Sequence, residues 1–130
     1  MPYKLFIAET DVFGKAKFAN SKGNTECVEF VRQATGAPKT TDWRKGIRVS
    51  DAKSGEIPRG TAIATFDAND RYPTDALGRH AAIYLAHDEH RILVLDQWNA
   101  QGQVLQRPIW FKRPKGTKRS NDADTFYVIK

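Results

Sequence analysis

The strongest constraint on the fold is a pair of apolar segments separated by a short polar one. Residues 80–85 read HAAIYL, residues 91–98 read RILVLDQW, and the polar tip AHDEH lies between these runs. Short runs rich in β-branched and aromatic residues on either side of a polar turn predict a β-hairpin. Further strands are predicted over residues 61–66, 103–111 and 125–130. We therefore expect an antiparallel sheet of about five or six strands.

One helix is predicted ahead of the strands, over residues 21–34. Cys27, Val31 and Ala34 recur at the spacing i, i+4, i+7, which is typical of one helix face. Gly36 is suited to the left-handed conformation that ends a helix. Cys27 then lies in the first turn. A single N-terminal helix packed on an antiparallel β-sheet defines the α+β class.

The length and composition fit one domain, residues 1–130. The hydrophobic content of 40% excludes wholesale disorder. No apolar run approaches the roughly 20 residues that a membrane-spanning helix needs. The N-terminus lacks the pattern of a Sec signal peptide, so we expect the protein in the cytoplasm of the producing cell. The single cysteine excludes an internal disulfide bond.

The net charge of +6 favours anionic partners such as nucleic acid, anionic lipid or bacterial cell wall. Part of the excess lies in a basic segment, residues 107–119, which also contains Trp110 and Phe111. Cations interleaved with aromatic residues are typical of single-stranded nucleic-acid sites. The simpler interpretation is a solvated loop with two aromatic anchors, so nucleic acid is not the expected partner.

Cys27 is a candidate nucleophile because of its position in the helix. The positive end of a helix dipole favours the thiolate, which is the reactive form of cysteine. The free N–H groups of the first turn are also able to hold an oxyanion. The same position on the apolar face equally fits a buried structural cysteine.

His80 is the candidate base among the three histidines. His87 and His90 lie in the polar tip, where the absence of further nearby ligands argues against a metal site. His80 instead opens an apolar strand. With a three-residue turn at 87–89 it lies opposite Asp96, and with a two- or four-residue turn it lies opposite Gln97 instead.

Asp96 is the candidate third member of the site. It interrupts an apolar face that contains Ile92 and Val94, and a buried carboxylate is costly unless it has a partner. His80 would supply that partner, and the carboxylate would fix the imidazole tautomer. Alternatively, Asp96 accepts hydrogen bonds from backbone N–H groups at the strand end.

Four segments together resemble the papain-like cell-wall hydrolases of the NlpC and CHAP type. They are NTECVEFVRQ, IPRGTAIATF, GRHAAIYL and VLDQW, all between Asn24 and Trp98. TTDWRKGIRV and LDQW resemble most a small bacterial NlpC-like family, some of whose members are candidate type VI secretion amidase effectors. The resemblance implies a papain-like fold in which Cys27 is the nucleophile, His80 the general base and acid, and Asp96 the orienting residue.

The resemblance also implies a substrate and partners. The expected reaction is hydrolysis of amide bonds in peptidoglycan stem peptides, with Trp43, Asn24 and Gln97 contacting substrate and without a metal or organic cofactor. Trp43 would alternatively cap the core. Export by type VI secretion to the periplasm and an inhibitory immunity protein would accompany an effector role. The competing functions are a basic nucleic-acid-binding module and a catalytically inactive interaction module, both with Cys27 buried.

Overall fold

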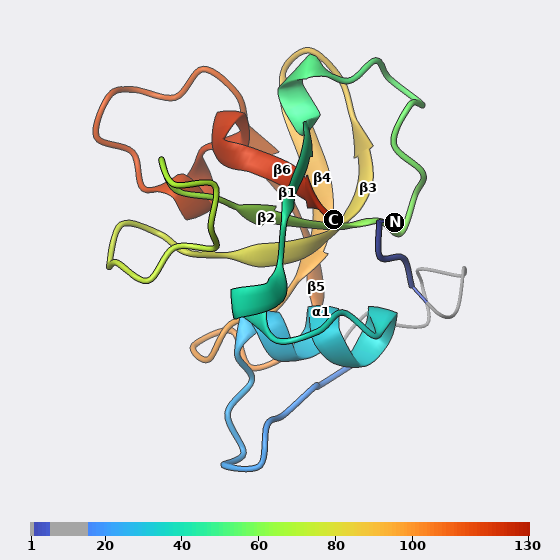
Figure 1. Ribbon diagram of the computed structural model, residues 1–130, viewed down its shortest axis with the longest axis vertical. Coiled ribbons are helices and arrows are strands. Elements are labelled where there is room, and N and C mark those ends of the chain that lie inside the picture. The colour runs from blue at the N-terminus through green and yellow to red at the C-terminus, as the bar shows by residue number, and fades with distance from the viewer. Residues whose placement is uncertain (1, 6–15) are drawn as a thin grey trace.

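A six-stranded antiparallel sheet and one α-helix make up the fold (Figure 1). The computed structural model describes residues 2–5 and 16–130. The helix is α1 (Cys27–Thr35), and the strands are β1 (Lys45–Arg48), β2 (Ala62–Thr65), β3 (Ala81–His87), β4 (Arg91–Asp96), β5 (Leu105–Trp110) and β6 (Phe126–Ile129). Their order across the sheet is β1-β6-β2-β3-β4-β5. The α+β class predicted from the sequence is confirmed.

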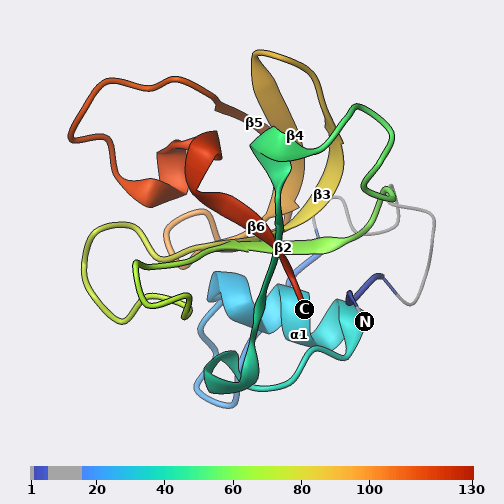
Figure 2. The same ribbon diagram turned by 45° about the horizontal axis from the view of Figure 1, so that its top comes forward.

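Among the described residues, four short 3-10 helices connect these elements. They are η2 (Thr40–Asp42), η3 (Val49–Asp51), η4 (Arg119–Asn121) and η5 (Ala123–Thr125). Both faces of the sheet are buried. Figure 2 shows α1 beneath one face, with η4 and η5 over the other. Phe30 and Val31 of α1 pack in the core on the first side, and Phe126 lies in the core on the second.

The helix α1 is shorter than the sequence predicted, because residues 20–24 form a turn instead. The side-chain oxygen of Asn20 accepts hydrogen bonds from the N–H groups of Lys22 and Asn24. Such local side-chain bonds compete with helix formation. The helix ends as predicted, with Gly36 in the left-handed conformation at φ 76°.

The strand β1 is not among the strands predicted from the sequence. The sequence of β1, KGIR, has no apolar alternation, and none of its residues is buried. It lies at the sheet edge and pairs only with β6, in an irregular register between Lys45 and Arg48. Its strand conformation therefore depends on a partner far away in the sequence. Lys45 pairs with Ile129, 84 positions later, and Arg48 pairs with Tyr127, 79 positions later.

The predicted hairpin of β3 and β4 is present, but the predicted register is wrong. Ile83 pairs with Leu95, and the register shifts between Tyr84 and Ala86. If the pairing of Ile83 with Leu95 is continued by one residue, Asp96 lies opposite Ala82. Ala82 is two positions from His80. Residues two apart on a strand share a face, so His80 and Asp96 become diagonal neighbours, which are still within reach of long side chains.

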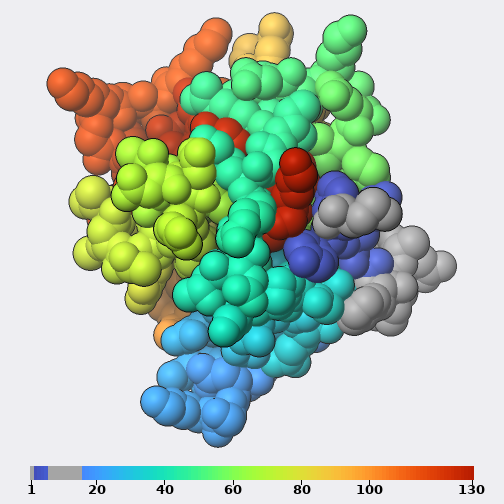
Figure 3. Space-filling model, viewed as in Figure 1, coloured from blue at the N-terminus to red at the C-terminus, as the bar shows by residue number. Residues whose placement is uncertain are grey.

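The basic segment, residues 107–119, begins in β5 and continues into an exposed loop. Figure 3 shows the part after β5, in orange, projecting from the surface at the upper left. Phe111 packs against the core as an anchor, whereas Trp110 is 44% exposed and lies 5.5 Å from the Arg91 guanidinium. Phe111 is therefore an aromatic anchor of the loop, as predicted, whereas Trp110 is not.

Candidate active site

Cys27 is the first residue of α1 and is half-buried. Glu26 precedes it in extended conformation and makes no capping hydrogen bond through its side chain. The first N–H groups of an α-helix have no partner within the helix, so those of Cys27 and Val28 are available at this end. The sulfur of Cys27 lies 3.7 Å from the hydroxyl oxygen of Tyr72. The structure thus places the thiol and the donors of a helix N-terminus together.

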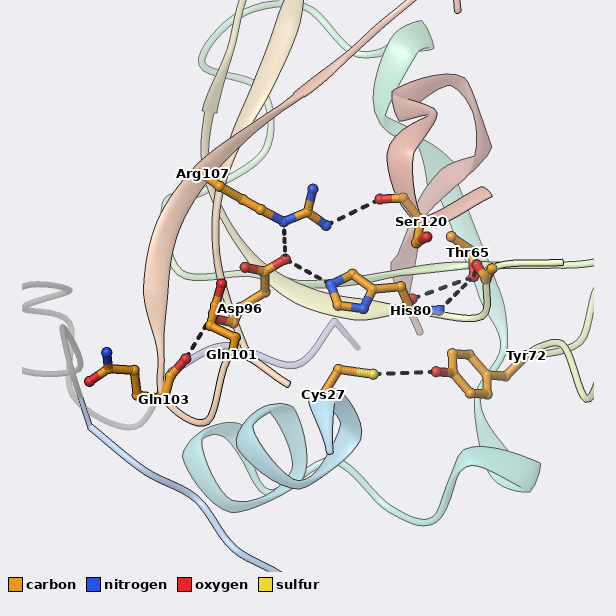
Figure 4. A network of polar contacts seen from close by, with 10 residues as sticks. Cys27, Thr65, Tyr72, His80, Asp96, Gln101, Gln103, Arg107 and Ser120 are labelled. Carbon is orange, nitrogen blue, oxygen red and sulfur yellow. Dashed lines mark hydrogen bonds and ion pairs between the residues drawn. The ribbon is translucent and has the colours of Figure 1, made fainter. Parts of the chain in front are cut away.

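His80 and Asp96 meet at the adjoining end of the sheet. Nε2 of His80 lies 2.7 Å from Oδ2 of Asp96, and the two residues are 5% and 0% exposed. The backbone of His80 is held by Thr65, whose Oγ1 accepts a hydrogen bond from the His80 N–H and whose own N–H donates to the His80 carbonyl. Figure 4 shows the second ring nitrogen on the side of the imidazole that faces Cys27.

A close contact before β3 fixes the backbone just ahead of His80. Gly78 has φ 97°, and a Cβ atom there would lie 2.7 Å from the backbone nitrogen of Arg119. The Arg119 N–H donates to the carbonyl of Leu77 at 3.0 Å. Glycine permits both the left-handed conformation and the close approach of η4.

The electrostatics of the site favour a thiolate next to an imidazolium. Burial disfavours the thiolate, but the hydrogen bond and charge of His80 outweigh it and hold the pKa of Cys27 below its ordinary value. The N–H of Ala81 and the hydroxyl of Tyr72 act in the same direction. Burial would lower the pKa of His80, but the hydrogen bond to Asp96 and the contact with Cys27 raise it to about 9. Each group therefore stabilises the charged form of the other.

Arg107 is a member of the site that the sequence analysis assigned only to the basic segment. Its Nε donates to Oδ2 of Asp96 at 2.6 Å, and its Nη2 donates to the carbonyl of Ser120 at 3.1 Å. Oδ1 of Asp96 is buried and has no hydrogen-bond partner among residues 2–5 and 16–130. The pairing of Asp96 with Leu105 makes Arg107 a diagonal neighbour on β5. Only the order of the strands, which the sequence analysis did not predict, reveals this contact.

Tyr72 was also missed, because the loop of residues 67–79 has no periodic pattern. Its ring packs edge-on against Trp43, with 5.0 Å between ring centroids. Trp43 is 1% exposed and donates its indole N–H to the carbonyl of Pro38. The expectation that Trp43 contacts substrate is therefore corrected. The indole belongs to the core and supports Tyr72 from behind.

Two other expected substrate contacts have different places in the structure. Gln97 is 0% exposed, and its side-chain amide bonds both the N–H and the carbonyl of Phe18 as well as the carbonyl of Glu26. A buried amide with these partners ties the chain together and has no surface to offer a ligand. Asn24 is exposed in the turn before α1 and does not line the cleft described next.

An open cleft of about 400 Å³ lies over Cys27 and His80. Besides those two residues, it is lined by Glu26, Val28, Thr40, Tyr72, Arg79, Trp98 and Asn99. Trp98 is 37% exposed and stacks on the guanidinium of Arg107 at 5.3 Å. The half-buried Cys27 thus lies in the wall of an open cleft.

The two histidines of the polar tip, His87 and His90, contact residues outside the site of Cys27 and His80. Nδ1 of His87 lies 2.5 Å from the Tyr84 hydroxyl, and its Nε2 lies 2.9 Å from the Ala52 carbonyl. The exposed His90 contacts Glu89 at 3.3 Å. Within residues 2–5 and 16–130, no group of three or more His, Cys, Asp and Glu residues is arranged to hold a metal ion.

The chain is similar to known proteins over most of its length. A solved structure described as type 6 secretion amidase effector 2 superposes with a TM-score of 0.80 at 29% identity, covering 95% of this chain and 92% of that one. The type VI secretion amidase effector 2 protein of Salmonella typhi is 34% identical over 80% of this chain and 84% of its own length. Domesticated amidase effector 2 of Ixodes scapularis is 38% identical over 80% of this chain and 70% of its own. The family model of domesticated amidase effector 2 matches residues 8–129, and the chain belongs to this family.

Proposed function

We propose that this chain is a cysteine amidase that hydrolyses an amide bond in the stem peptides of peptidoglycan. Membership of an amidase effector family supports the reaction class. The observation that carries the proposal is the placement of Cys27 at the start of α1, beside an imidazole whose Nε2 lies 2.7 Å from the Asp96 carboxylate. A nucleophile, a base and a group that orients the base are the requirements of acyl transfer through a covalent intermediate.

Acylation begins with attack of the Cys27 thiolate on the carbonyl carbon of the amide. The resulting oxyanion is stabilised by backbone N–H groups at the start of α1. His80, as the imidazolium, donates its proton to the leaving nitrogen, the C–N bond breaks, and an amine departs. The acyl group remains on the sulfur as a thioester.

Deacylation uses the same groups in reverse roles. Neutral His80 takes a proton from a water molecule, whose oxygen attacks the thioester carbonyl carbon. Collapse of the second tetrahedral intermediate breaks the C–S bond and releases a carboxylic acid and the thiolate, with the imidazolium restored. Asp96 accepts the hydrogen bond from Nε2 throughout, so that the nitrogen facing Cys27 is the one that exchanges protons.

The proposal extends to delivery and control. Two of the similar proteins are type VI secretion amidase effectors, which supports export of this chain by such a system into the periplasm of another cell. A producing cell would then need an inhibitory immunity protein that covers the cleft. In the part of the chain that the structure describes, no helix combines the length and the apolar character needed to cross a membrane.

The test is digestion of purified peptidoglycan from a Gram-negative bacterium, with the muropeptides identified by mass spectrometry. The parent protein should generate fragments with a new amine and a new carboxyl end, which also names the bond. Cys27→Ala and His80→Ala should generate none, whereas Arg113→Gln, a change in the exposed loop, should match the parent. The same muropeptides from the parent and from Cys27→Ala would refute the proposal.

A further inference from the structure

Arg79 occupies a central position among the hollows around the site. It lines the cleft over Cys27 and a second hollow of about 330 Å³ that also contains Trp98 and Arg107. It also lines a hollow beside Trp43 and Tyr72, and another beside Asp75 and Lys118. A chain that lies in the cleft over Cys27 therefore also passes Arg79.

Arg79 is exposed, and among the described residues its side chain forms no hydrogen bond or ion pair. Its charge adds to the larger effect of Arg119 in lowering the pKa of Asp75. Two nearby arginines are used in a different way. Arg107 is paired with Asp96 at 2.6 Å, and Arg119 contacts Asp75 at 2.7 Å. Among the described residues that line the cleft over Cys27, Arg79 is the one arginine or lysine, and its planar set of N–H donors is open to a ligand.

The charge of Arg79 acts on the groups that face the thiol. Burial raises the pKa of Tyr72, and the Arg79 charge works against that rise. The hydroxyl of Tyr72 lies 3.7 Å from the Cys27 sulfur, and both residues line the same cleft as Arg79. Glu26 is the one carboxylate among the residues that line this cleft.

Stem peptides offer a ligand of the right chemistry. They include residues joined through a side-chain carboxyl or amine, which leaves a free α-carboxylate beside the amide bond. Arginine binds a carboxylate through two parallel hydrogen bonds, which gives both charge and geometric selectivity. We propose that Arg79 binds a free carboxylate of the substrate next to the bond that is cut, an inference that rests on the function proposed above.

The test on substrate compares two muropeptides that differ only in this group, one with the carboxylate free and one with it amidated. The parent protein should have a kcat/KM higher by roughly tenfold or more on the free carboxylate, mainly through a lower KM. Arg79→Gln should abolish that preference, and Arg79→Lys should restore part of it. Arg113→Gln removes the same charge from the exposed loop and should preserve the preference. Equal cleavage of both muropeptides by the parent would overturn the inference.

A second test does not depend on peptidoglycan. Iodoacetate and iodoacetamide alkylate the same thiol, but only iodoacetate carries a carboxylate. We expect the ratio of their rates with Cys27 to fall several-fold in Arg79→Gln and to stay at the parent value in Arg113→Gln. An unchanged ratio in Arg79→Gln would refute carboxylate binding whether or not the wall is cleaved. Conversely, failed wall digestion with a reduced ratio would refute the substrate and leave the anion site established.

Discussion

Arg107 and Asp96 form an ion pair at 2.6 Å through Oδ2, the oxygen that also contacts His80. Asp96 is fully buried, whereas the Arg107 side chain is 21% exposed. Removing one partner of a buried pair leaves an uncompensated charge, which is far more costly than the net contribution of the pair. The arrangement identifies Arg107 as a positioning residue, since it reaches the imidazole only through the carboxylate.

For Arg107→Met we expect a loss of about 3 kcal/mol in the free energy of unfolding, at the lower end of the range for broken buried pairs because Arg107 is partly exposed. Urea denaturation measures it, with Arg113→Met as the matched control. The double variant Asp96→Asn/Arg107→Met should lose less than the sum of the single losses. Additive losses would show that the two side chains are not coupled.

For Asp96→Asn we expect the alkaline limb of the activity profile to move to lower pH. The carboxylate favours the imidazolium and is a main reason that the pKa of His80 is raised to about 9. In the parent, the Cys27 thiolate and the His80 imidazolium should therefore coexist up to about pH 9, beginning at a pH below the ordinary pKa of cysteine. Measurement of kcat/KM between about pH 5 and about pH 10 checks this. A limb that stays near pH 9 in a folded Asp96→Asn protein would contradict it.

The pH dependence of alkylation should report the pairing of Cys27 with His80. Iodoacetamide reacts with the thiolate, and the hydrogen bond and charge of His80 lower the pKa of Cys27. His80→Ala removes both while burial still disfavours the thiolate, so the rise in rate should shift to higher pH. Identical curves for the parent and His80→Ala would mean that the imidazole does not stabilise the thiolate. Mutating His90, which is exposed in the polar tip, provides the control.

Gln97→Ala and Asn24→Ala should separate a structural amide from an exposed one. Gln97 satisfies groups of Phe18 and Glu26, so its loss should cost about 1–3 kcal/mol of unfolding free energy. Asn24→Ala should change stability by less than about 0.5 kcal/mol, and kcat/KM should match that of the parent. Thermal denaturation and muropeptide release measure the two effects. A larger catalytic defect in Asn24→Ala than in Gln97→Ala would restore Asn24 as a substrate contact.

The parts of the fold that the sequence predicted are those encoded by local patterns. The apolar runs around the AHDEH tip lie in β3 and β4, and helical spacing placed Cys27 in the first turn of α1. β1 has no such pattern. Its strand conformation comes from pairing with β6, which the local sequence does not reveal. The helix is shorter than predicted because the side chain of Asn20 binds backbone N–H groups in the turn before it.

The candidate site was predicted in part, for reasons that follow from the sheet. Cys27, His80 and Asp96 lie together, although the register expected for the hairpin was wrong, because diagonal neighbours on one face still meet. Arg107 comes from β5, and its contact with Asp96 depends on the order of the strands. Tyr72 comes from an aperiodic loop. Neither has a local signature in the sequence.

Asp96 and Gln97 are consecutive residues whose side chains serve opposite sides of the sheet. The carboxylate contacts the imidazole of His80, and the next side chain holds the carbonyl of Glu26, just before the nucleophile. A slip of this strand by one position would exchange the two groups, offering an amide to the histidine and a charge to the helix entrance. The contacts of both side chains therefore depend on the register of β4, and a slip of one position would lose them together.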